Sequence, residues 1–77
     1  MQVYVVLSEF TIGGRGKFSK EPIVFLTAEA AEAYLNKEMA KITDPWFKTF
    51  DGPVCTIWEC AKQYVQFEVH TVTVRGE

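Results

Sequence analysis

The 77-residue sequence lacks the features that define secreted, disulfide-rich and membrane-spanning proteins. Its two cysteines, Cys55 and Cys60, are five positions apart, which points them to opposite faces of a strand or about 140° apart on a helix. No apolar run approaches the roughly 20 residues that cross a bilayer, and the N-terminus lacks the basic segment of a signal peptide. We therefore expect a cytoplasmic protein with two reduced thiols and no membrane contact.

The sequence also lacks an excess of charge of one sign and a recognisable catalytic motif. Its formal net charge of −2 gives no overall attraction to nucleic acid or anionic membranes. The glycine-rich loop 13–20 differs from a phosphate-binding loop in its spacing, and it leads into a strand instead of a helix. Cys55, Cys60 and His70 are too few, and too widely spaced, for a structural zinc site. We therefore predict no metal, no cofactor and no enzymatic activity.

The remaining reactive side chains are interpreted as structural. The two thiols are expected to be small buried side chains, and a Cys–His catalytic pair is the alternative that the sequence leaves open. His70 lies in a polar stretch and is interpreted as a solvated strand residue. Nothing specifies a cleft for acid–base chemistry, so the acids on or near expected strands are interpreted as solvated: Glu9, Glu59 and Glu68.

The chain contains one clear helix pattern. Thr27 is a favourable N-cap, and apolar residues recur at helical spacing over residues 28–42, with acidic residues early and lysines late. Segments rich in β-branched and aromatic residues predict the strands: 2–12, 23–26, 54–60 and 64–74.

This order, β-β-α-β-β, predicts one α+β domain over residues 1–77. Short links favour antiparallel neighbours, which gives a three- to four-stranded antiparallel sheet with one helix packed on one face. Residues 45–53 are expected to be a connection that ends in a turn at Asp51-Gly52-Pro53. A second helix over residues 54–64 is the competing interpretation, because Trp58, Ala61 and Val65 have helical spacing.

The sequence has more apolar and aromatic residues than one covered face requires. Aromatic residues make up 14% of the chain, and the apolar phase of the last strand changes near His70. That change predicts either a bulge or apolar side chains on the second face. One helix covers one face only, so we expect a protein-binding surface, with a thin aromatic core as the alternative. Its predicted residues are Trp46, Phe47, Phe50, Val72 and Val74.

The partner is expected to be another macromolecule, although a homodimer is a second way to cover the free face. Arg15, Lys17 and Lys20, in the loop 13–20, are predicted to make electrostatic contacts that orient the complex. The same three residues support an alternative function as a small nucleic-acid-binding module.

Residues 1–35 begin with Met-Gln-Val-Tyr-Val-Val-Leu-Ser-Glu-Phe and continue into a strand followed by a Thr-capped helix rich in Glu and Ala. This opening resembles that of short phage and prophage accessory proteins. The resemblance implies a non-enzymatic inhibitor, of the kind represented by anti-CRISPR proteins, that masks a surface of a host protein or ribonucleoprotein complex. Such a protein acts in the cytoplasm of the host cell.

Overall fold

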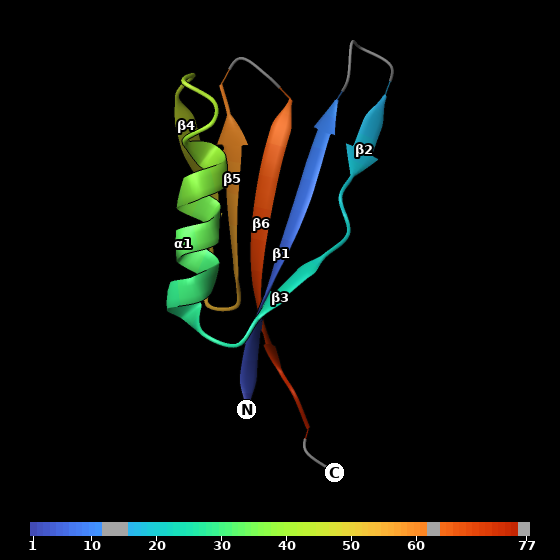
Figure 1. The fold of residues 1–77 in the computed structure, drawn as a ribbon, viewed down its shortest axis with the longest axis vertical. Coiled ribbons are helices and arrows are strands. Elements are labelled where there is room, and N and C mark those ends of the chain that lie inside the picture. The colour runs from blue at the N-terminus through green and yellow to red at the C-terminus, as the bar shows by residue number, and fades with distance from the viewer. Residues whose placement is uncertain (12–15, 62–63, 76–77) are drawn as a thin grey trace.

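The computed structural model describes residues 1–11, 16–61 and 64–75, which form one helix and six strands (Figure 1). In chain order these are β1 (Gln2–Thr11), β2 (Lys17–Ser19), β3 (Ile23–Phe25), α1 (Ala28–Met39), β4 (Trp46–Asp51), β5 (Cys55–Cys60) and β6 (Val65–Thr73). They form one antiparallel sheet in the order β2-β1-β6-β5-β4, and β3 pairs with β1 further along the edge that β2 occupies.

The α+β class and the single helix agree with the sequence prediction, but the number of strands does not. The sheet has six strands instead of three or four. The two strands that the sequence did not predict are β2 and β4. β2 is three residues long and fully exposed, so no apolar alternation indicates it. β4 occupies residues 46–51, within the segment predicted to be a connection, and the turn at residues 52–54 follows it.

The helix begins where the sequence predicts and ends three residues earlier. The Ala30 N–H donates to Thr27 Oγ1 at 3.1 Å, so Thr27 is the N-cap. The predicted last turn is instead tightened, because the Lys41 N–H donates to Glu38 and the Ile42 N–H to Met39, three residues back.

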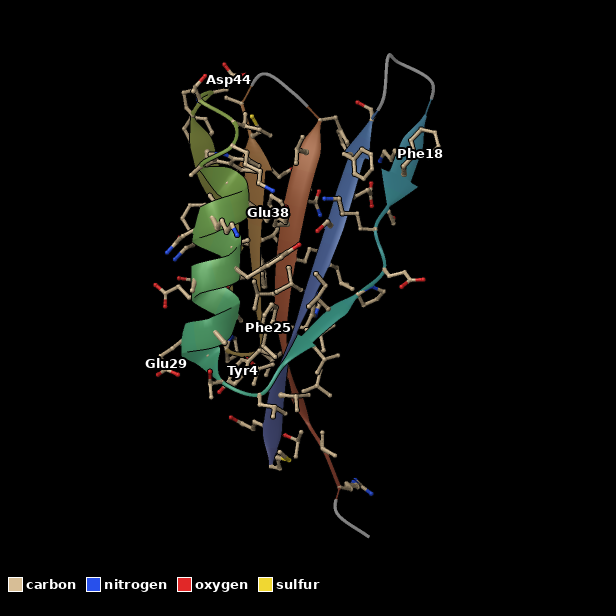
Figure 2. All side chains as sticks on the ribbon, in the orientation of Figure 1. Tyr4, Phe18, Phe25, Glu29, Glu38 and Asp44 are labelled. Carbon is tan, nitrogen blue, oxygen red and sulfur yellow. The ribbon has the colours of Figure 1, made fainter. Side chains whose placement is uncertain are left out.

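The core is thin and lies between the helix and one face of the sheet. Ala31 and Leu35 of α1 pack against Val6 and Phe67, the last two on the central strands β1 and β6. Tyr4, paired with Phe25, lies near the start of the helix (Figure 2). The radius of gyration of 13.2 Å exceeds the about 11.5 Å expected for a compact chain of this length, so the molecule is elongated.

The C-terminal half settles two open points. Residues 55–60 form β5, which excludes the alternative helix over 54–64. The pairing of β1 with β6 runs without a shift from Gln2 opposite Thr73 to Phe10 opposite Val65. The phase change near His70 is therefore not a bulge, and Val72 lies on the face opposite to Phe67.

Candidate functional site

The pairing of the strands assigns every strand residue to one of two faces. Val6 and Phe67 lie beneath the helix, and residues in register with them form what we term the covered face. The alternate residues form the uncovered face, and no helix or strand of the described residues lies over it. On the uncovered face lie Val3, Val5, Leu7, Val24, Phe47, Phe50, Cys55, Ile57, Glu59, Glu68, His70 and Val72.

The margin of the uncovered face is apolar and exposed. Phe47 and Phe50 are 55% and 52% exposed, and Val24 on the opposite side is 57% exposed. Val72 and Val74 are each 42% exposed, and the Val74 N–H donates to the Met1 carbonyl at 2.8 Å, which extends the pairing beyond β6. Exposed apolar side chains gathered on one face of a monomer mark a contact surface more often than isolated ones do.

A bulge in β4 places both phenylalanines on this face. Residues three apart on a regular strand point to opposite faces. The pairing of β4 with β5 shifts between Lys48 and Phe50, so that Phe47 lies opposite Glu59 and Phe50 opposite Ile57. The inserted residue turns Phe50 back to the side of Phe47. The Phe50 ring then covers Gly52, where a Cβ atom would come within 2.7 Å of it.

A polar group of side chains lies on the uncovered face along β6, with Leu7 and Ile57 on either side of Glu68. Cys55 of β5 lies directly opposite His70 of β6, with 3.7 Å between Cys55 Sγ and His70 Nε2. Glu68, two residues before His70, places Oε1 3.0 Å from the same Nε2. The Gln66 amide donates to Glu68 Oε2 at 3.0 Å. We term Cys55, Glu68 and His70 the central cluster.

The surroundings of the thiol in the central cluster favour its neutral form. Burial raises the pKa of Cys55 above its usual value, and the negative charge of Glu68 raises it further. A catalytic cysteine requires the opposite shift, towards the thiolate. The Cys–His pair that the sequence left open is therefore near in space, with the pKa of its thiol shifted towards the neutral form.

The uncovered face also has an acidic character. Glu9 lies at the margin of this face, and its charge is balanced by a neighbouring lysine. Its carboxylate accepts a hydrogen bond from the Tyr64 hydroxyl at 2.6 Å and lies 3.7 Å from Lys17 Nζ. Glu59 and Glu68 lie instead on the central strands β5 and β6. A partner with positive charge would complement these two acids.

The structure places four of the five predicted protein-binding residues on one face of the sheet. Phe47, Phe50, Val72 and Val74 share the uncovered face. Trp46 does not, because its ring lies 5.6 Å from that of Phe67 on the covered face and its indole N–H donates to the Met39 carbonyl at 3.1 Å. Trp46 thus joins β4 to the end of the helix, and we leave it out of the candidate site.

The lysines that were predicted to make electrostatic contacts, Lys17 and Lys20, do not lie on one surface. Lys17 points to the uncovered face beside Glu9, whereas Lys20 Nζ lies 3.7 Å from Glu38 of the helix. Arg15 lies outside the described residues. The two described lysines therefore face different sides of the sheet, and each already has an acidic neighbour.

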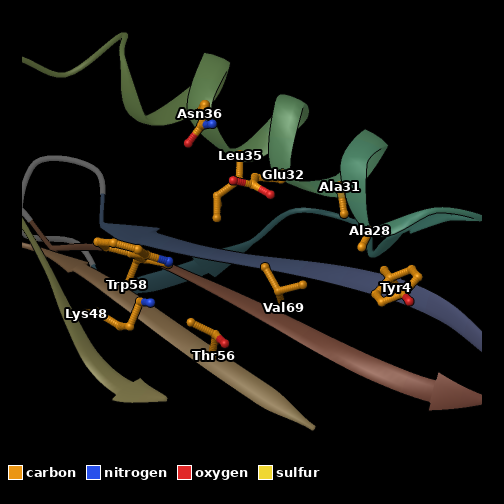
Figure 3. A pocket seen from close by; sticks show the side chains of 10 residues that line it. All are labelled: Tyr4, Ala28, Ala31, Glu32, Leu35, Asn36, Lys48, Thr56, Trp58 and Val69. Carbon is orange, nitrogen blue, oxygen red and sulfur yellow. The ribbon is translucent and has the colours of Figure 1, made fainter. Parts of the chain in front are cut away.

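Two grooves flank the helix on the covered face. The first, of about 320 Å³, separates α1 from β4 and β5, and Glu32, Asn36, Lys48 and Trp58 are among its lining residues (Figure 3). The second, of about 260 Å³, lies on the other side of the helix and is bordered by the ion pair of Lys41 and Glu38. Both are open hollows, and both lie away from the exposed phenylalanines.

Models of known protein families, curated proteins and solved structures give no significant match to this chain. Among the residues that the structure describes, no helix has the length and apolar character needed to span a bilayer.

Proposed function

We propose that this chain is a non-enzymatic protein-binding domain that uses the uncovered face to cover a surface of a different protein. The observation that supports this function is the gathering of Phe47, Phe50, Val72 and Val74, all 42–55% exposed, on a face that no described element covers. Aromatic side chains such as Phe47 and Phe50 are enriched in protein interfaces relative to the rest of the surface.

The chemistry of the face favours a particular kind of partner. An apolar margin around Glu59 and Glu68 is complementary to an apolar surface with lysine or arginine side chains near its centre. A two-fold contact between two copies, centred on this face, brings the same acids together, which like-charge repulsion disfavours. The proposed occupant is therefore a second, basic protein surface and not another copy of this chain.

A phage-encoded inhibitor that masks a host defence protein or ribonucleoprotein complex is a narrower form of this proposal. It rests on the resemblance of residues 1–35 to phage accessory proteins. Nucleic acid is the less favoured partner, since Lys17 and Lys20 point to different sides of the sheet.

The experiment compares capture by the wild-type domain with capture by variants of each face. A Phe47→Ser/Phe50→Ser double variant is expected to lose at least tenfold in affinity for a captured protein, because it removes two exposed rings from the margin. Phe18→Ser is the matched control, since Phe18 is 44% exposed but lies on the covered face beside Phe10. Circular dichroism establishes that both variants are folded.

Two further measurements test which surface of this protein binds the partner and whether the partner carries positive charge. Protection from hydrogen exchange in the complex is expected in β4, β5 and β6, and Glu59→Gln is expected to weaken binding by less than the double variant. The proposal is overturned if Phe18→Ser weakens capture as much as the double variant does. It is also overturned if light scattering shows a dimer that the double variant dissociates, because the occupant is then a second copy.

A further inference from the structure

The three side chains of the central cluster converge on one point. Their ligating atoms, Cys55 Sγ, a Glu68 carboxylate oxygen and a His70 ring nitrogen, all lie within 4.8 Å of one another. Both the sulfur and the carboxylate approach the same ring atom, His70 Nε2, at 3.7 Å and 3.0 Å. A catalytic relay uses the two ring nitrogens separately, one for the nucleophile and the other for the acid. The three ligating atoms instead lie close enough to one another to surround a shared metal ion.

The two distances to His70 Nε2 are close to those of four-coordinate geometry. Ligands at about 2.0–2.3 Å from a tetrahedral zinc ion lie about 3.3–3.6 Å from one another. The two distances to Nε2 fall on either side of that range, so small rotations of the side chains would place an ion among them. The backbone fixes their relative positions, because Cys55 and His70 are paired across β5 and β6 and Glu68 is two residues away on the same face.

The surroundings of the cluster also suit a metal site. Gln66 donates to Glu68 Oε2, which orients the carboxylate and leaves Oε1 directed to the cluster. The side chains of Glu68 and His70 are 27% and 35% exposed, so an ion can reach them from solvent. Three protein ligands leave a fourth position for water, as in open zinc sites.

We propose that Cys55, Glu68 and His70 bind one divalent transition-metal ion, zinc or cobalt, on the uncovered face. A ligand set of one sulfur, one imidazole nitrogen and one carboxylate oxygen selects these ions over magnesium and calcium. On binding, the thiol sulfur forms a bond to the metal and its proton passes to solvent. This site does not depend on the proposed partner, and it departs from the sequence prediction of no metal, which did not consider Glu68 as a ligand.

The test is titration of the isolated, untagged protein with Co²⁺. One equivalent is expected to produce a thiolate-to-cobalt charge-transfer band in the near ultraviolet and visible bands of tetrahedral cobalt, and excess Zn²⁺ is expected to remove both. Cys55→Ser is expected to abolish the charge-transfer band. Glu68→Gln and His70→Gln are expected to weaken Co²⁺ binding at least tenfold.

Cys60→Ser is the matched control, since Cys60 is the other free thiol and lies on the covered face opposite Trp46. It is expected to leave the spectrum and affinity unchanged. The proposal is wrong if wild-type protein gives no charge-transfer band, if the band persists in Cys55→Ser, or if Cys60→Ser removes it. Should Cys55→Ser fail to fold, Glu68→Gln with unchanged circular dichroism tests the same site.

Discussion

The covered and uncovered faces of the sheet are built from alternate residues of the same strands, yet they differ in what packs against them. In β6, Phe67 is 5% exposed beneath the helix, whereas Val72, on the other face, is 42% exposed. The covered face combines apolar residues with the helix to form a core. The uncovered face instead carries polar side chains along β6, with Leu7 and Ile57 beside them and exposed phenylalanines on β4. The comparison shows that apolar residues of one strand are buried beneath the helix on one face and exposed to solvent on the other.

The largest expected difference between the faces is in the loss of folding free energy when one phenylalanine on each face is replaced by alanine. Phe67→Ala removes a buried ring and is expected to cost about 3–4 kcal/mol. That is a large part of the roughly 4–11 kcal/mol expected for a domain of this size. Phe47→Ala, at a site 55% exposed, is expected to cost less than about 1 kcal/mol. Urea unfolding followed by circular dichroism measures both, and equal losses would remove the distinction between the faces.

A smaller effect is expected where β4 meets the helix. Trp46→Phe keeps an aromatic ring beside Phe67 but removes the indole N–H that donates to Met39. The expected loss is about 1 kcal/mol, because the Met39 carbonyl still accepts from the Ile42 N–H. Phe47→Leu, a comparable change on the neighbouring residue, is the control. If Trp46→Phe costs nothing, the hydrogen bond does not help to attach β4 to the helix.

The smallest expected effect on stability comes from the charge of Glu38, at the end of the helix. A hydrogen bond from Lys41 lowers the pKa of Glu38 below its usual value near 4.5, and the charges of Lys41 and Lys20 lower it further. A lowered folded-state pKa means that the carboxylate stabilises the fold above pH 4.5 and loses this effect as the pH falls through the lowered value. Glu38→Gln is expected to lower the melting temperature by a few degrees at neutral pH and to have no effect in acid. Thermal melts across that range test the sign, which would be reversed if Glu38 opposed folding.

The helix and the two long strands were predictable because each has a strong local pattern. Thr27 caps a segment with helical apolar spacing, and residues 2–11 are rich in β-branched side chains. β4 was missed because its bulge puts aromatic residues at 46, 47 and 50, which breaks the alternation of a regular strand. The bulge explains why Phe47 and Phe50 share a face, whereas Trp46 lies on the other face because adjacent residues of a strand point in opposite directions.

The central cluster was less predictable than the exposed apolar residues. Phe47 and Phe50 stand out by composition alone, but the proximity of Cys55 to His70 depends on the register of β5 against β6. A shift of one residue would turn either side chain to the other face. The spacing of Glu68 and His70, two residues apart on an expected strand, was the available signal that they share a face.

The two edges of the sheet both carry features that hinder pairing with another molecule, and the bulge in β4 is one of them. A regular, flat outer strand offers its backbone groups to any other extended chain, which leads to fibres. At one end the bulge in β4 interrupts that row, and at the other the short strands β2 and β3 leave Pro22, which has no N–H, between them. The addition of strands from other molecules is thereby discouraged at both edges of the sheet. We therefore expect the protein not to form fibres at high concentration, although the apolar side chains of the uncovered face remain exposed to solvent.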